Sequence, residues 1–256
     1  GYRKNAQVTV GALTNINIST DMRRFEKQKV LPFMLNQIAD AGYTSFEYCP
    51  GGPPEAEYIR FSTFDINDGR QSLGSIGTMS FIQEGMNGND TFVENLRNRA
   101  YSQLAGMKAF LQFAYENAIE IKKLVSLERK SILENTAGSA ISIQCDHKSN
   151  GSVLKLPLVN YSTKTDTIVE VHNFKPDVYS LKNVQAPFAY LIPKNDKNLI
   201  NWCKTHHFKT IKSPEKNAFS VLKYAQTGYT VTLDFEGDTV VLFPMTEMAE
   251  NNFNLH

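Results

Sequence analysis

A long helical stretch at residues 91–135 is the feature that most constrains the fold. It far exceeds the ~11–12 residues of an average globular helix. Asn117 belongs to the residue types that cap helix N-termini, so we expect a break or kink beside it. Strands alternate with helices before this stretch and predominate after it, which predicts an α/β first half and a smaller β-rich α+β domain. We place the boundary near Thr136, giving domains of residues 1–136 and 137–256.

The first half is interpreted as a partial mixed sheet with flanking helices. Apolar and β-branched residues predict short strands at residues 7–15, 44–48 and 79–82. A helix is expected over residues 22–41, because a Ser-Thr-Asp cluster precedes it and its apolar residues recur at helical spacing. Gly42 follows, where a glycine that ends a helix belongs.

The second half contains mostly predicted strands, at residues 140–145, 153–159, 167–173 and 189–192. A short helix is expected at residues 196–206. Apolar and polar residues alternate from Tyr229 to Phe235, which is typical of a half-buried strand. The turn Glu236-Gly237-Asp238 then predicts a hairpin.

The overall composition gives no support to several partner classes. The chain has 27 Lys+Arg against 26 Asp+Glu, and no basic block stands out, so a nucleic-acid or anionic-membrane partner has no electrostatic support. An apolar content of 41% supports a packed core. The three cysteines lie far apart without a CxxC pair, so we interpret them as buried or free thiols.

Several catalytic patterns are absent from the sequence, namely GxGxxG, GxxxxGK[ST], GxSxG and HExxH. One carboxylate nevertheless stands out, because Glu84 comes directly behind the predicted buried strand at residues 79–82. A charge there is costly unless it is solvated in a cleft or paired, and strand ends in α/β sheets are common sites. Arg70, fourteen residues upstream, is a candidate for a second polar contact; a structural ion pair or a solvated loop is its alternative.

The segment Met79-Ser80-Phe81-Ile82-Gln83-Glu84 resembles the stretch around the catalytic glutamate of zinc carboxypeptidases of the carboxypeptidase A type. In that family a strand of small and apolar residues ends in Glu. Residues 21–48 are similar to the family's helix and strand before the active-site loop, and residues 95–130 to its long terminal helix. Residues 187–193 and His206-His207 are similar to a domain appended to some bacterial members.

The resemblance implies a mechanism with a zinc-bound water whose proton is taken by the glutamate, while an arginine grips the terminal carboxylate of the substrate. Glu84 matches the general base, and Arg70 becomes the expected substrate-binding residue. The family's HxxE zinc ligands and later His have no counterpart here. We therefore expect no cofactor in this chain and zinc only in the intact parent enzyme.

The predicted function is that of a fragment of a zinc metallocarboxypeptidase-like protein, inactive alone, whose parent hydrolyses C-terminal peptide bonds. A non-catalytic ligand- or protein-binding module is the alternative. The expected partners are a peptide substrate in the parent and a second copy of the chain, because an incomplete sheet leaves an open edge. The sequence does not determine the localisation; an exported bacterial protein of the periplasm or cell surface is the working hypothesis.

Overall fold

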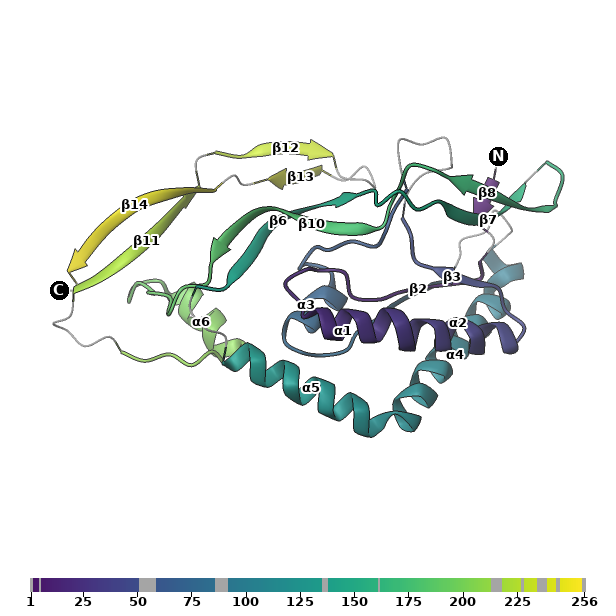
Figure 1. Cartoon of the computed structure of the whole chain (residues 1–256), viewed down its shortest axis with the longest axis horizontal. Helices are drawn as coiled ribbons and strands as arrows, with labels where there is room; N and C mark the ends of the chain where they lie inside the picture. The colour runs from purple at the N-terminus through teal and green to yellow at the C-terminus, as the bar shows by residue number, and fades with distance from the viewer. Residues whose placement is uncertain are drawn as a thin grey trace. The chain divides into compact units, whose positions relative to one another are not determined.

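The computed structural model describes residues 2–4, 6–50, 59–85, 92–134, 138–160, 162–212, 218–226, 228–233, 239–242 and 245–254. The chain divides into two compact units, Gly1–Phe188 and Ala189–His256. Helices and small mixed sheets make the fold broadly α/β, as expected (Figure 1). None of the helices in the described part of the chain is long and apolar enough to cross a membrane.

A three-stranded mixed sheet lies at the centre of the first unit. Its strands are β2 (Val8–Gly11), β3 (Ser45–Glu47) and β5 (Ile82–Gly85), in the order β3-β2-β5. β2 pairs parallel with β3 and antiparallel with β5. Val8 and Val10 are fully buried, whereas Thr9 is half-buried. Alternate side chains of β2 therefore point toward the helices.

The predicted N-terminal helix forms as one continuous rod with an irregular middle. α1 (Thr20–Phe25) passes through the π-helical stretch η1 (Glu26–Val30) into α2 (Leu31–Asp40). The Ser19 side chain accepts a hydrogen bond from the Met22 N–H and caps the start. Gly42 has a φ of 85° behind the last turn, which confirms the expected glycine stop.

The long helical stretch is broken beside Asn117, as predicted. α4 (Phe92–Glu116) and α5 (Ala118–Leu133) meet there at a bend that is visible in Figure 1. Asn117 stands at the cap position of α5, but its Nδ2 donates back to the Phe113 carbonyl at 2.9 Å instead of capping the new helix. The backbone N–H of Asn117 donates to the same carbonyl at 2.9 Å, so both groups of Asn117 close the end of α4.

The main core lies between the sheet and the helices. It joins Val8 and Val10 of β2 to one side of the N-terminal rod and to Ala109 and Phe113 of α4. The row on the N-terminal rod consists of Phe25, Val30, Leu31, Met34 and Ile38. A second cluster, on the side of β3 that carries Phe46, includes Cys49, Ile59, Leu156, Leu158 and Val171.

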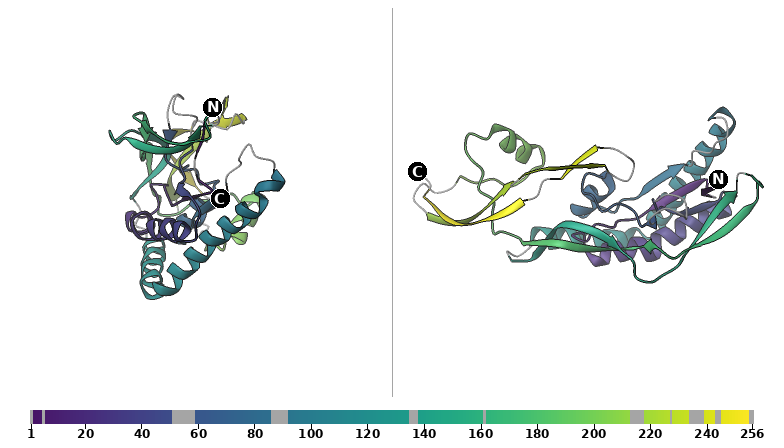
Figure 2. Two further views of the ribbon diagram at one scale, coloured as in Figure 1. Left: turned by 90° about the vertical axis from the view of Figure 1, so that its right-hand side faces the viewer. Right: turned by 90° about the horizontal axis from the view of Figure 1, so that it is seen from above.

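Between α5 and the end of the first unit, the chain forms a long antiparallel ribbon (Figure 2). It contains the pairs β6 (Ala140–Lys148) with β10 (Asp177–Gln185), and β7 (Leu154–Asn160) with β8 (Asp166–Val171). The N-terminal strand β1 (Tyr2–Lys4) pairs with β7, and β4 (Ile59–Arg60) pairs with β9 (Phe174–Lys175).

These pairings join the segments before and after α5 into the first unit, Gly1–Phe188. Thr136, where the sequence places a domain boundary, lies outside the described residues. Strands from the N-terminal half, β1 and β4, complete sheets whose other members follow α5. The cluster of Cys49, Ile59 and Leu156 buries the same connection. A local sequence pattern carries no information about such long-range partners.

The second unit contains α6 (Lys197–Thr205) and two antiparallel pairs, β11 (Ala218–Gln226) with β14 (Met245–Asn254) and β12 (Thr230–Leu233) with β13 (Thr239–Leu242). Asp196 caps α6 by accepting from the Leu199 N–H at 2.9 Å, and the predicted hairpin is present as β12 and β13. The turn at residues 236–238 lies outside the described residues. Residues 189–192, expected as a strand, form none.

Candidate functional site

Glu84 lies inside β5 and not behind it. The strand begins at Ile82, runs antiparallel to β2 at the edge of the sheet, and places Glu84 opposite Thr9 with an exposed side chain. The expectation of a buried strand at residues 79–82 that ends before Glu84 is therefore wrong. The Ser80 N–H donates to the Glu26 carboxylate at 2.9 Å instead of to a neighbouring strand, so sheet pairing starts later.

Arg70 lies in α3 (Gly69–Ser75), a short helix capped by Asp68. Arg70 is only 4% exposed, and its Nη2 pairs with Asp68 Oδ2 at 3.2 Å. The structural ion pair left open by the sequence is thus present, whereas the solvated loop is not. Within the described residues, Nε and Nη1 of Arg70 are buried without a hydrogen-bond partner. Burial lowers the pKa of Arg70, and the charge of Asp68 opposes that shift.

Arg70 and Glu84 belong to the same face of the sheet. A Cβ built on Gly11 would lie 2.5 Å from Arg70 Nη1 and 2.8 Å from Ile82 Cγ2, so both side chains approach Gly11 from one side. Gly11 pairs with Ile82 in the ladder. Glu84 is two residues beyond Ile82 on β5, so their Cα atoms are about 7 Å apart. Residues two apart on a strand share a face.

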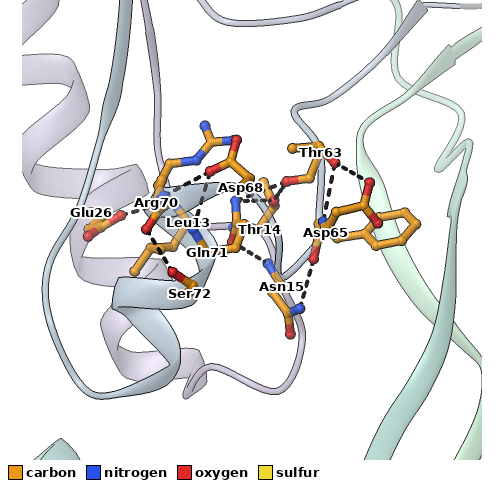
Figure 3. Close-up of polar contacts among 12 residues, drawn as sticks. Leu13, Thr14, Asn15, Glu26, Thr63, Asp65, Asp68, Arg70, Gln71 and Ser72 are labelled. Carbon is orange, nitrogen blue, oxygen red and sulfur yellow. Dashed lines mark hydrogen bonds and ion pairs between the residues drawn. The ribbon is translucent and has the colours of Figure 1, made fainter. Parts of the chain in front are cut away.

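A buried polar network holds α3 against the segment that follows β2 (Figure 3). Gln71 is fully buried; its Oε1 accepts from the backbone N–H groups of Thr14 at 3.1 Å and Asn15 at 3.0 Å. Its Nε2 donates to Thr14 Oγ1 and to the Thr63 carbonyl, each at 2.9 Å. All four of these bonds cross between separate segments, so Gln71 fixes the position of α3 and of the neighbouring Arg70.

Glu26 is a second buried member of this region. Its Oε2 accepts from the Leu13 N–H at 2.9 Å, and its Oε1 accepts from the Ser80 N–H at 2.9 Å. Burial raises the pKa of Glu26 to about 8, although the two backbone hydrogen bonds and the charge of Arg70 oppose the shift. The residue therefore joins the end of β2 to the approach to β5 and is protonated over much of the neutral range.

The described residues contain no group of three or more His, Cys, Asp or Glu side chains that could hold a metal ion. His147 is buried beside the Phe64 ring, whereas His172 is exposed near Glu170. His206 and His207 follow α6 in the second unit. Zinc, the metal that the family resemblance implies, does not fit the donor groups of this part of the chain.

Sequence analysis missed Glu26, Gln71 and the helix α3. A signal for Glu26 was available, because it occupies a row of positions spaced by four, Met22, Glu26, Val30, Met34 and Ile38, whose other members are apolar and buried. Asp68, a good capping residue, marked the start of α3. Gly74 and Gly77 weaken the helical signal of this segment. The hydrogen-bond partners of Gln71 lie too far along the chain to predict.

No protein-family model, no curated protein and no solved structure matches the chain. Functional assignment therefore depends on the geometry of its own residues.

Proposed function

We propose that this chain is the portion of a zinc metallocarboxypeptidase-like enzyme that carries the general-base glutamate, Glu84, and an arginine, Arg70, for the terminal carboxylate of a peptide substrate. The parent enzyme would hydrolyse C-terminal peptide bonds. One observation carries this proposal: Arg70 and Glu84 lie on the same sheet face, one with unused N–H donors and the other with an exposed carboxylate.

The state of Arg70 supports a ligand-binding role. An unsatisfied buried N–H costs about 1–3 kcal/mol, and Arg70 carries such groups at both Nε and Nη1. A substrate carboxylate that accepts from either of these N–H groups would recover part of that cost. The ion pair with Asp68 occupies Nη2, which both bidentate edges of the guanidinium share, so a carboxylate would contact Nε or Nη1 through a single hydrogen bond.

Glu84 supplies the complementary chemistry. An exposed carboxylate can accept a proton from a water molecule. The described residues offer no fitting zinc site, so among them we find no group that would lower the pKa of that water. We therefore expect the purified chain to cleave no peptide, and metal analysis to find well under one zinc ion per chain.

Carboxylate binding tests the proposal directly. We expect an N-acetylated dipeptide with a free C-terminus to shift the Arg70 Nε–H resonance in NMR titrations, and the same peptide with an amidated C-terminus to shift it far less. Arg70→Gln should abolish binding. Arg24→Gln is the matched control, because the Arg24 side chain is 59% exposed. Equal binding of the acid and the amide would contradict the role of Arg70.

One observation favours the alternative, a non-catalytic protein-binding module. α4 exposes an apolar row at helical spacing, formed by Leu104, Met107, Leu111 and Tyr115. A second copy of the chain is the partner proposed for it. Sedimentation equilibrium should then show a dimer that Leu111→Glu dissociates, whereas a strict monomer at all concentrations would remove the support for this alternative.

A further inference from the structure

We propose that residues 190–212, here termed the α6 surface, bind the surface of a membrane that contains anionic lipid. The proposal is independent of the metallocarboxypeptidase-like role, because it concerns the second unit and none of the residues around Arg70. It depends on two properties that coincide on this segment: a local excess of lysine and a set of exposed apolar side chains.

The charge of the α6 surface differs from that of the rest of the chain. Residues 190–212 contain five lysines and one aspartate, whereas the remaining residues contain 22 Lys+Arg and 25 Asp+Glu. Near-neutrality of the whole chain conceals this local excess. All five of the lysines are exposed: Lys194, Lys197, Lys204, Lys209 and Lys212. The single carboxylate, Asp196, is half-buried and accepts from the Leu199 N–H at 2.9 Å.

Apolar side chains are exposed among these lysines. Trp202 is 50% exposed and Phe208 is 56% exposed, and their rings stack with centroids 5.1 Å apart. The His206 ring also contacts Trp202. Further exposed apolar residues are Tyr190, Leu191, Leu199 and Ile211. Aromatic and aliphatic side chains that are interleaved with lysines are typical of segments that lie in the interfacial region of a bilayer.

Lipid fits this surface better than a nucleic acid. Single-stranded nucleic acids are bound by aromatic rings that stack on bases, but Trp202 already stacks on Phe208 and contacts His206. Exposed Leu191 and Ile211 add nothing to base stacking, whereas insertion between lipid headgroups buries them. Every basic side chain of the segment apart from histidine is lysine, whose long stem extends along apolar surface while its charge stays in water.

Trp202 is the only tryptophan of the chain and reports binding directly. Vesicles of phosphatidylcholine mixed equally with phosphatidylglycerol should shift its fluorescence emission to shorter wavelength and sediment with the full chain. Vesicles of phosphatidylcholine alone should do neither to a comparable extent. About 1 M NaCl, at which the Debye length is about 3 Å, should weaken the binding strongly.

Paired variants locate the surface. Each lysine near an anionic membrane strengthens binding about fivefold, so Lys209→Gln with Lys212→Gln should weaken it about 25-fold. Lys122→Gln with Lys123→Gln removes the same charge from exposed positions of α5 and should leave it unchanged. Ile211→Asn should also weaken binding, whereas Ile168→Asn, at another exposed isoleucine, should not. Circular dichroism verifies that each variant is folded.

Three outcomes would overturn the proposal. These are no spectral shift with the anionic vesicles, equal binding to both kinds of vesicle, and equal losses from the two lysine pairs. A shift with a single-stranded oligonucleotide in the absence of vesicle binding would assign the α6 surface to nucleic acid instead.

Discussion

The Glu26 carboxylate accepts a hydrogen bond from the backbone N–H of Ser80 at 2.9 Å, although 54 residues separate them in the sequence. The bond secures the chain just before β5, where Ser80 would otherwise have an unsatisfied N–H. The same carboxylate holds the Leu13 N–H behind β2. Glu26 thus fixes the relation between two adjacent strands of the central sheet from a position in the helical layer.

Stability should consequently fall as the pH rises through the neutral range. Burial raises the pKa of Glu26 from its ordinary value of 4.5 to about 8, so the folded state binds a proton that the unfolded state releases. The stabilisation that protonated Glu26 gives the folded state is fully present below about pH 4.5 and is lost as the pH approaches about 8. The urea concentration at the midpoint of unfolding should therefore decrease as the pH is raised from about 4.5 to about 8.

Glu26→Gln provides the comparison for that pH series. The variant cannot titrate, so its midpoint should vary less with pH, although it should be less stable at pH 5 because its amide nitrogen cannot accept a backbone N–H. Glu120→Gln, on the exposed side of α5, should follow the wild-type slope. Parallel curves for wild type and Glu26→Gln would show that Glu26 is not the titrating group.

Gln71→Leu should be among the most damaging substitutions in the first unit. It leaves the buried N–H groups of Thr14 and Asn15 without their acceptor, whereas the Thr63 carbonyl keeps the Thr14 hydroxyl as a donor. At about 1–3 kcal/mol for each unsatisfied N–H, the free energy of unfolding should drop by roughly 2 kcal/mol or more. Chemical denaturation measures it, with Gln112→Leu on the exposed side of α4 as the control; a loss below about 1 kcal/mol would contradict the network.

Gly11→Ala tests the close packing of Arg70 on β2. The new Cβ would lie 2.5 Å from Arg70 Nη1, 2.8 Å from Ile82 Cγ2 and 3.0 Å from Tyr48 Cβ. Such overpacking typically costs about 1–3 kcal/mol, and displacement of the guanidinium should also weaken carboxylate binding.

Gly69→Ala is the matched control for this substitution. No atom lies within 4 Å of its added Cβ at the start of α3, so the change should be neutral or stabilising by up to about 1 kcal/mol. Equal effects of the two substitutions on thermal unfolding would contradict the packing described here.

Local patterns predicted the elements whose signals lie within a few residues of one another. The helix stop at Gly42, the break at Asn117 and the hairpin of β12 and β13 all follow from capping and alternation. The pairing of β5 and the start of α3 did not, because both depend on distant groups. Ser80 is withheld from the sheet by Glu26, and α3 is held in place by the contacts of Gln71 with Thr14 and Thr63.

The candidate site likewise combines residues that local patterns select with an arrangement that depends on distant groups. Sequence reasoning selected Glu84 and Arg70 separately, from a strand end and a family resemblance. Their common sheet face requires the register that sets Gly11 opposite Ile82 and Thr9 opposite Glu84. Register is determined by packing of the whole sheet, so it could not be predicted from the segment of residues 70–85 alone.

Glu84→Gln separates a catalytic carboxylate from a structural one. Because Glu84 is exposed on an edge strand, the free energy of unfolding of this chain should change by less than about 0.5 kcal/mol. In a parent enzyme that supplies the zinc ligands, the same substitution should leave zinc affinity unchanged, since the residue is not a ligand. It should lower turnover by a factor on the order of 10² to 10⁴, the usual effect of losing a positioned general base. Glu170→Gln, at another exposed glutamate, should leave zinc affinity and turnover unaffected. Full turnover in the Glu84→Gln parent would mean that the base of the reaction, if there is one, is a different residue.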